Sequence, residues 1–177
     1  ASALHRNPLE LVRCNTVDIE VPAAAEIVLE GKLLPEVREL EGPFGEYPRY
    51  YGPKSPRPVI ELSCVCHRNN PIYHTIVPAT MEHFLLGGIA REAGLIELIR
   101  NIVPTVVAVN LTEGGSGRYH LVISIDKKNE GEGKSAIFAA LGSSAEIKHV
   151  VCVDSDIDIF NMTEVEWAIA TRVQASK

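Results

Sequence analysis

The chain has 177 residues, with 23 acidic and 17 basic side chains and a formal net charge of −6. Hydrophobic residues make up 46% of the chain, which is enough to build a globular core. The acidic balance argues against general nucleic-acid binding, because such proteins need a basic face to displace counterions from phosphates. The sequence has no signal peptide and no apolar run of transmembrane length, so we expect a cytoplasmic protein without a membrane span.

The first part of the chain is expected to be rich in β-structure. Apolar and β-branched residues predict five strands, over residues 9–12, 18–21, 24–33, 58–68 and 72–77. Gly31 is expected to break the third of them. Residues 36–52 differ in kind, because they combine glycines, prolines, aromatic residues and carboxylates without a consistent period. Such a loop is a costly way merely to join two strands, so it is a candidate site.

The second part alternates between strands and helices. Apolar spacing predicts helices over residues 82–103, 133–141 and 164–173, and strands over residues 105–111, 119–126 and 147–153. Thr80 is expected to cap the first helix and Gly94 to divide it, while Thr163 and Glu166 are expected to form a capping box on the last. The fold class is therefore α/β (α+β), with a boundary between residues 78 and 79.

Two carboxylates bracket the tightest part of the irregular loop, in the segment Glu41-Gly42-Pro43-Phe44-Gly45-Glu46. A pair of this kind can divide labour, because one acid keeps its charge while the other is pushed to a higher pKa and donates a proton. The alternative is a solvated surface turn with two unrelated acids, and spacing alone favours that alternative.

Five segments in order resemble the UbiD family of decarboxylases. The loop continues as EGPFGEY, and it is preceded by VPAAAEIVLEG (residues 21–31) and followed by RNNPI (68–72), VCVDSDIDI (151–159) and WAIATR (167–172). One match would be weak, whereas the ordered set spans nearly the whole chain and is specific. The resemblance implies part of a split β-barrel flavin-binding domain over residues 1–78, followed by an α/β C-terminal region over residues 79–177.

The resemblance also implies a chemistry. The family removes or adds carboxylate on aromatic or α,β-unsaturated acids by a non-oxidative, reversible reaction that uses prenylated FMN. Glu46 would be the proton donor and acceptor at the reacting carbon, and Glu41 would pair with an arginine. Glu82, His83 and Leu86 would line the substrate pocket. Arg13, Arg38 and Arg49 are conceivable partners of Glu41, although none stands at the family's position.

Family members are longer than this chain, and the resemblance places the ligands of the divalent metal, the potassium ion and the flavin phosphate outside it. We therefore name no metal ligand here. The chain is expected to be a fragment or a subunit, to need the remainder of the enzyme or a companion chain, and to be inactive in isolation. A homo-oligomer is expected from the family alone.

Other features have plainer interpretations. Cys14, Cys64, Cys66 and Cys152 lack zinc spacing and are read as reduced, buried thiols. The acidic run over residues 154–158 resembles a hard-metal cluster, but it follows a buried strand and lacks the pattern of a calcium loop. Residues 131–135 resemble part of a nucleotide-binding loop, but they lack the glycine spacing of a phosphate loop. The alternative to an enzyme is a non-catalytic α/β assembly subunit that uses the apolar helix at residues 84–103 for oligomer contacts.

Overall fold

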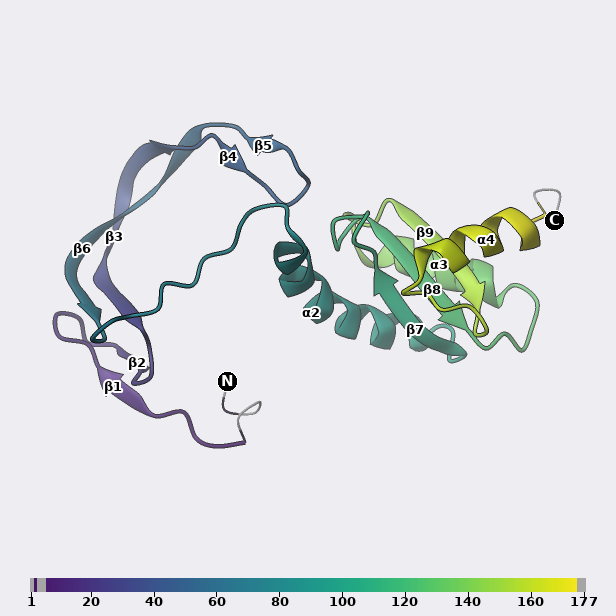
Figure 1. The fold of residues 1–177 in the computed structure, drawn as a ribbon, viewed down its shortest axis with the longest axis horizontal. Coiled ribbons are helices and arrows are strands. Elements are labelled where there is room, and N and C mark those ends of the chain that lie inside the picture. Colours follow the sequence, from purple (N-terminus) through teal and green to yellow (C-terminus); the bar gives the residue numbers. More distant parts are fainter. Residues whose placement is uncertain (1, 3–5, 175–177) are drawn as a thin grey trace. The chain divides into compact units, whose positions relative to one another are not determined.

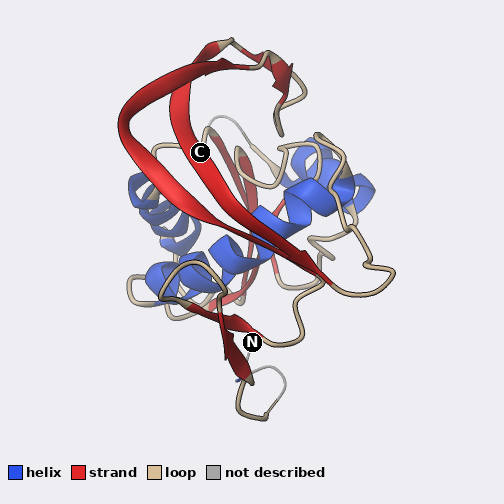
Figure 2. Cartoon of the chain, turned by 90° about the vertical axis from the view of Figure 1, so that its left-hand side faces the viewer, coloured by secondary structure: helices blue, strands red, loops and turns tan. Residues whose placement is uncertain are grey.

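Two long antiparallel strands, β3 (Ile27–Glu41) and β6 (Ser55–His67), form a curved ribbon in the computed structural model (Figure 2). Their register shifts between Glu30 and Gly31 and again between Leu34 and Arg38. A side chain at Gly31 would press on the carbonyl oxygen of Glu61, so this glycine permits the close approach of the two strands at the first bulge.

The structure describes residue 2 and residues 6–174. These residues group into two units (Figure 1). The first unit comprises the described residues up to Phe44 together with Tyr51–Thr75, and the second comprises Gly45–Tyr50 together with the chain from Ile76 onward. The predicted mixed α/β class is confirmed, because the first unit consists of strands and the second combines a sheet with helices.

A short hairpin completes the first unit. Strands β1 (Leu11–Arg13) and β2 (Glu20–Pro22) pair antiparallel. The turn between them is fastened to the ribbon by the buried carboxylate of Glu30, which accepts hydrogen bonds from the backbone N–H groups of Asn15 and Thr16. These bonds hold the pKa of Glu30 below its ordinary value, because they favour the charged form.

Two expectations for this unit are wrong. Strand β3 does not end near Gly31 but runs on to Glu41, because residues 38–41 find partners in β6 at residues 55–58. Residues 72–77 form no strand, because they pair with no other described segment in a β-ladder. An extended backbone needs such pairing to satisfy its N–H and C=O groups. The irregular loop therefore shrinks to the segment after Glu41, which contains the two-residue strands β4 (Phe44–Gly45) and β5 (Tyr51–Gly52).

A three-stranded sheet lies at the centre of the second unit (Figure 1). Strand β7 (Val106–Leu111) pairs antiparallel with β8 (His120–Ile125), and β8 pairs parallel with β9 (His149–Asp154). Helices α2 (Met81–Arg100) and α3 (Glu132–Ser143) cover one face. The core under them is formed by the apolar residues Ile99, Val103, Val109, Leu111, Leu121, Ile123, Ala136 and Ala140.

Helix α4 (Met162–Arg172) covers the opposite face, where Val165 and Ala168 pack on Val122 and Val153. The expected cap at Thr163 is wrong, because the helix begins two residues earlier, at Met162. Asn161 is the N-cap, and its side-chain oxygen accepts a hydrogen bond from the backbone N–H of Thr163 at 3.2 Å. Both residue types are good caps, so composition alone does not choose between them.

Helix α2 is continuous, which overturns the expected break at Gly94. An isolated glycine costs a helix about 1 kcal/mol, and packing of the helix on β7 and α3 outweighs that cost. Thr80 stands at the N-cap position as expected, but its hydroxyl donates to the carbonyl of Val77 and makes no cap to the helix. None of the described helices is long and apolar enough to cross a membrane.

Candidate functional site

The carboxylate loop, residues 41–52, carries the two acids of the EGPFGE segment. Glu46 begins a tight turn, in which its N–H donates to the carbonyl of Tyr50 at 2.9 Å and its carbonyl accepts from the N–H of Arg49 at 3.0 Å. Arg49 closes this turn in the left-handed region, with φ of 68°. The side chain of Glu46 is half-buried. A carboxyl group in such a turn has a defined position without being sealed from solvent.

Glu41 stands at the end of β3 and belongs to the first unit, whereas Glu46 belongs to the second. A carboxylate oxygen of Glu41 lies 3.9 Å from Nε of Arg57, and both side chains are exposed. An exposed pair at this distance contributes little to stability. The sequence does not indicate Arg57 as a partner, because it lies across the ribbon rather than near Glu41 in sequence.

The three arginines considered from the sequence have other contacts. Arg13 lies 3.8 Å from Asp18, and Arg38 donates to two carbonyl groups of its own strand. Arg49 places its guanidinium 5.6 Å from the ring centre of Phe84, at the start of α2. Within the described residues, Arg57 is therefore the arginine that is paired with Glu41.

Tyr47 fastens the turn of Glu46 within the second unit. Its hydroxyl lies 2.7 Å from the hydroxyl of Tyr119, which precedes β8. The guanidinium of Arg118 lies 4.0 Å from the centre of the Tyr47 ring, and the ring of His83 meets Tyr47 edge-on at 6.1 Å. Burial, followed by the hydroxyl pair, raises the pKa of Tyr47 above its ordinary value. The tyrosine therefore stays neutral near pH 7 and acts as a fixed hydrogen-bonding anchor.

Glu146 holds Arg118 in place under Tyr47. The carboxylate of Glu146 accepts from Nη1 of Arg118 at 3.2 Å and from Nη1 of Arg91 on its other oxygen. The hydrogen bond from Arg91, together with the positive charges of both arginines, lowers the pKa of Glu146. We call Tyr47, Tyr119, Arg118 and Glu146 the tyrosine anchor. All four belong to the second unit, and sequence reasoning missed the group because its members are far apart along the chain.

The three residues expected to line the substrate pocket do not point the same way. Glu82 and Leu86 line an open, largely apolar cavity of about 550 Å³ on α2, together with Met81, Leu85, Ile89 and Ala90. His83 lies on the side of Tyr47, and its Nδ1 accepts a hydrogen bond from the N–H of Ala79 at 3.3 Å. Residues 82, 83 and 86 therefore serve two different surfaces of the helix.

Two family models cover the chain. The model described as the 3-octaprenyl-4-hydroxybenzoate carboxy-lyase Rift-related domain matches residues 1–81, and the model of the C-terminal domain of the same family matches residues 84–177.

The chain belongs to the UbiD family.

Named UbiD relatives are carboxy-lyases. The chain is 48% identical over 174 residues to anhydromevalonate phosphate decarboxylase of Methanothermobacter thermautotrophicus, covering 98% of this chain and 41% of the relative. It is 33% identical over 189 residues to gallate decarboxylase of Lactiplantibacillus plantarum, covering 100% of this chain and 39% of the relative. The chain thus spans about 40% of the length of these relatives.

A solved UbiD structure shows the same fold. An evolved dimeric form of HmfF from Pelotomaculum thermopropionicum, in complex with prFMN, superposes with a TM-score of 0.97 at 66% identity. The match covers 99% of this chain and 41% of that chain.

The residues of this chain fit only part of a prenylated flavin. Within the second unit, Glu46 offers a half-buried carboxyl group in a defined turn, which suits the acid that a flavin-dependent reaction requires. The site of the flavin phosphate is not matched in the same way, because it requires a hard divalent metal ion. The metal-ligand cluster found among the described residues contains two thiols, which suit soft cations.

That cluster is better explained by folding than by metal binding. Cys64 and Cys66 lie on the same side of β6 with their sulfur atoms 3.4 Å apart, close to the carboxylate of Glu30. The Glu30 carboxylate already accepts three hydrogen bonds from Asn15 and Thr16. The cysteines therefore pack beside a carboxylate that closes the β1–β2 turn.

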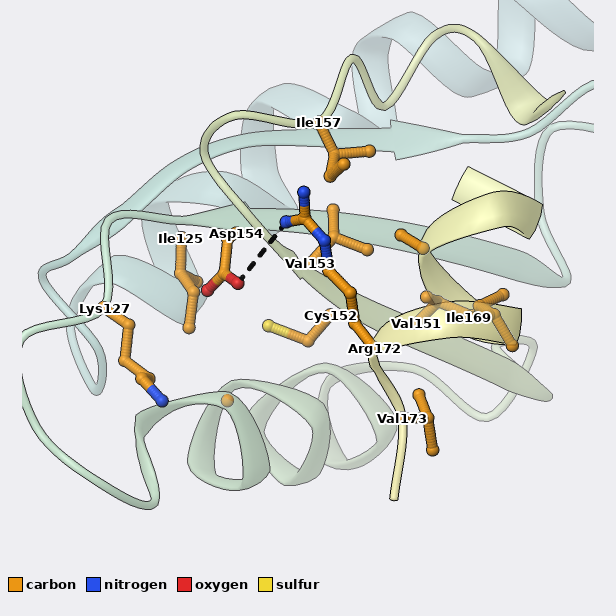
Figure 3. A pocket seen from close by; sticks show the side chains of 12 residues that line it. Ile125, Lys127, Val151, Cys152, Val153, Asp154, Ile157, Ile169, Arg172 and Val173 are labelled. Carbon is orange, nitrogen blue, oxygen red and sulfur yellow. Dashed lines mark ion pairs between the residues drawn. The ribbon is translucent and has the colours of Figure 1, made fainter. Parts of the chain in front are cut away.

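The acidic run after β9 contacts Arg172 of α4. The guanidinium of Arg172 donates to both oxygens of Asp156, at 2.8 and 2.7 Å. It also lies 3.8 Å from Asp154 (Figure 3). Next to this pair a cavity of about 240 Å³ is lined by Cys152 and Lys127 among apolar side chains. These carboxylates thus join the end of β9 to the end of α4, which is a structural use of the run.

Proposed function

We propose that this chain is part of a non-oxidative, reversible decarboxylase of aromatic or α,β-unsaturated carboxylic acids. The support is the family membership, the carboxy-lyase activity named for its relatives, and the prFMN bound by the related HmfF. The single observation that carries the assignment to residues is the turn that holds the half-buried Glu46 beside the anchored Tyr47.

In this proposal Glu46 moves the proton. The bond between the substrate carbon and its carboxylate breaks, carbon dioxide leaves, and the carbon receives a proton from the Glu46 carboxyl group. Prenylated FMN, when bound, supplies the place where the electron pair of the broken bond is held. The ionised Glu46 then recovers its proton from solvent, and in the reverse direction it removes the proton from the same carbon.

Glu41 is proposed to act through an arginine rather than on the substrate. A carboxylate that pairs with an arginine holds the guanidinium in a fixed direction. The exposed contact with Arg57 at 3.9 Å is too long for such a charge-assisted hydrogen bond. We therefore assign to Glu41 an arginine partner in the complete enzyme.

Glu82 and Leu86 are proposed to line the substrate pocket from α2, where the apolar cavity suits the carbon skeleton of an unsaturated acid. His83, named with them from the family resemblance, is proposed to line the substrate site from the other surface of α2, beside Tyr47.

The remaining assignments describe the complete enzyme. Residues 1–78 would form part of the flavin-binding barrel and residues 79–177 the C-terminal α/β region. The barrel assignment is supported by the ribbon, whose apolar side chains Leu29, Leu33, Ile60 and Val65 are more than half exposed and need cover. The other ligands of the flavin, its divalent metal and potassium would come from the remainder of the enzyme or a companion chain. A homo-oligomer in the cytoplasm is proposed, and the isolated chain is expected to be inactive.

A non-catalytic assembly subunit is the second candidate, favoured by the exposed apolar residues Leu85, Leu86 and Ile89 on α2. The two candidates differ at Glu46. In the complete enzyme loaded with cofactor, Glu46→Gln should abolish decarboxylation while the flavin absorbance stays unchanged. Glu36→Gln, which alters an exposed acid of β3, should leave the rate unchanged. Decarboxylation by Glu46→Gln at the normal rate would refute the assignment.

A further inference from the structure

The hydrogen bonds described above for Glu46 are made by its backbone and not by its side chain. The position of its carboxyl group is therefore set by the turn that contains it. That turn comprises Gly45–Tyr50, which belongs to the second unit. The backbone bonds between Glu46, Arg49 and Tyr50 make the turn rigid internally. A rigid turn carries its side chains to one place only if it is fastened to the body of the protein.

Tyr47 provides that fastening by two different interactions. Its hydroxyl is paired with Tyr119 at 2.7 Å, and its ring faces the guanidinium of Arg118 at 4.0 Å. The hydroxyl pair fixes the tip of the side chain, while the cation over the ring fixes its plane. The other contacts of the turn are looser, since Arg49 lies 5.6 Å from the ring centre of Phe84.

The surface that receives Tyr47 is itself fixed. Arg118 and Tyr119 follow a turn in which the N–H of Gly117 donates to the carbonyl of Thr112 at 3.0 Å. A side chain at Gly117 would lie 2.7 Å from the carbonyl oxygen of Phe84, so this turn is pressed against the first turn of α2. Glu146 completes the support by bonding Arg118. The partners of Tyr47 are therefore held by contacts that do not involve the loop.

We propose that Tyr47 is a positioning residue, which holds the Glu46 carboxyl group at the reacting carbon through its hydrogen bond to Tyr119. This inference rests on the proposed role of Glu46 in proton transfer. Tyr47 stays neutral near pH 7, because burial, followed by the hydroxyl pair, raises its pKa, and its hydroxyl group is paired with that of Tyr119. A displacement of a reacting group by about 1 Å can lower a rate about 100-fold. Loss of one hydroxyl should allow a smaller displacement.

The test compares Tyr47→Phe, Tyr119→Phe and the double variant in the complete, cofactor-loaded enzyme. Each change removes one side of the same hydrogen bond and keeps both rings. Tyr73→Phe is the matched control, because its side chain is exposed and it lies outside the carboxylate loop. The readouts are kcat, KM, flavin absorbance, and the rate at which the C–H of the decarboxylated product exchanges with D2O.

We expect kcat and the exchange rate to fall about tenfold in both single variants, with KM and flavin absorbance unchanged. The double variant should be no slower than either single variant, because one bond is lost in all three. Normal exchange in both single variants, or a loss in Tyr47→Phe that Tyr119→Phe does not share, would overturn the proposal. If Tyr47→Phe fails to fold or to hold flavin, Tyr119→Phe alone decides.

The Glu46→Gln variant separates this inference from the function on which it rests. Normal exchange by Glu46→Gln would remove the proposed role of Glu46 altogether. No exchange by Glu46→Gln, together with normal exchange by both tyrosine variants, would leave that role intact and remove only the positioning role of Tyr47.

Discussion

The guanidinium of Arg118 lies 4.0 Å from the ring centre of Tyr47 and directs an N–H at the carboxylate of Glu146. One cation thus serves a ring on one side and a carboxylate on the other. Within the second unit, the arrangement ties the turn that contains Tyr47 to the segment between α3 and β9 that carries Glu146.

Replacing Glu146 by glutamine should loosen this support. Arg91 and Arg118 would lose their shared negative partner. Because the Glu146 side chain is partly exposed, the free energy of unfolding should fall by about 1 kcal/mol or less. Hydrogen exchange of residues 45–50 should become faster in Glu146→Gln. Glu113→Gln, in an exposed turn, is the control. Unchanged protection of residues 45–50 would show that Glu146 does not support the loop.

Glu132 should make the start of α3 sensitive to acid. Its carboxylate accepts hydrogen bonds from the N–H of Lys128, the amide of Asn129 and the hydroxyl of Thr105, and these bonds lower its pKa from 4.5 to about 2. A depressed pKa adds stability that is present above the unfolded value and is lost as pH falls through the folded value. Protection of residues 127–133 from hydrogen exchange should therefore decrease between about pH 4.5 and pH 2.

Glu132→Gln is the matched variant for that experiment. It should show weaker protection than the unchanged protein at pH 6, and the difference should shrink as the pH approaches 2. A difference that stayed constant across this range would contradict a role for the charged carboxylate.

Cys152 should be a slow nucleophile. Its thiol is partly buried beside the cavity of Figure 3, and burial, followed by the negative charge of Asp154, raises its pKa to about 11. Because the thiolate is the reactive form, alkylation by iodoacetamide should be slow at pH 8 and should accelerate as the pH approaches 11. Peptide mass spectrometry follows the reaction. Rapid alkylation of Cys152 at pH 8 would contradict the burial of this thiol.

Two glycine-to-alanine changes should have opposite effects. Gly31→Ala places a methyl group against the carbonyl of Glu61, so it should destabilise the β3–β6 ribbon by about 1–3 kcal/mol. Gly94→Ala adds a methyl group with nothing within 4 Å, in the middle of α2, and should stabilise the protein by about 0.5–1 kcal/mol. Thermal unfolding of both variants is the measurement, and a stabilised Gly31→Ala would argue against the bulge.

Sequence patterns predict the second unit better than the first. The apolar residues of α2 recur at helical spacing, and β7, β8 and β9 are short apolar runs, so the ends of these elements are predicted to within about three residues. The extension of β3 to Glu41 is missed, because residues 36–41 are mostly polar and become a strand only by pairing with β6. Pairing partners lie far away in sequence and leave no local pattern.

The residues of the candidate site are likewise predicted only in part from the sequence. The motif draws attention to Glu41 and Glu46 because their spacing and their glycine and proline neighbours are local. The contact between Tyr47 and Tyr119 joins residues 72 positions apart, and no property of either tyrosine indicates the other. Arg57 is likewise brought near Glu41 only by the register of the β3–β6 ribbon.

The most direct test of the account is the exchange of the product C–H with D2O by the complete enzyme, measured for the unchanged protein and for Glu46→Gln with equal flavin content. A general acid contributes about 10²- to 10⁴-fold to a rate, so we predict that the exchange rate of Glu46→Gln falls by that factor. Exchange at the rate of the unchanged protein would show that another group moves the proton, and it would contradict the central role assigned to Glu46.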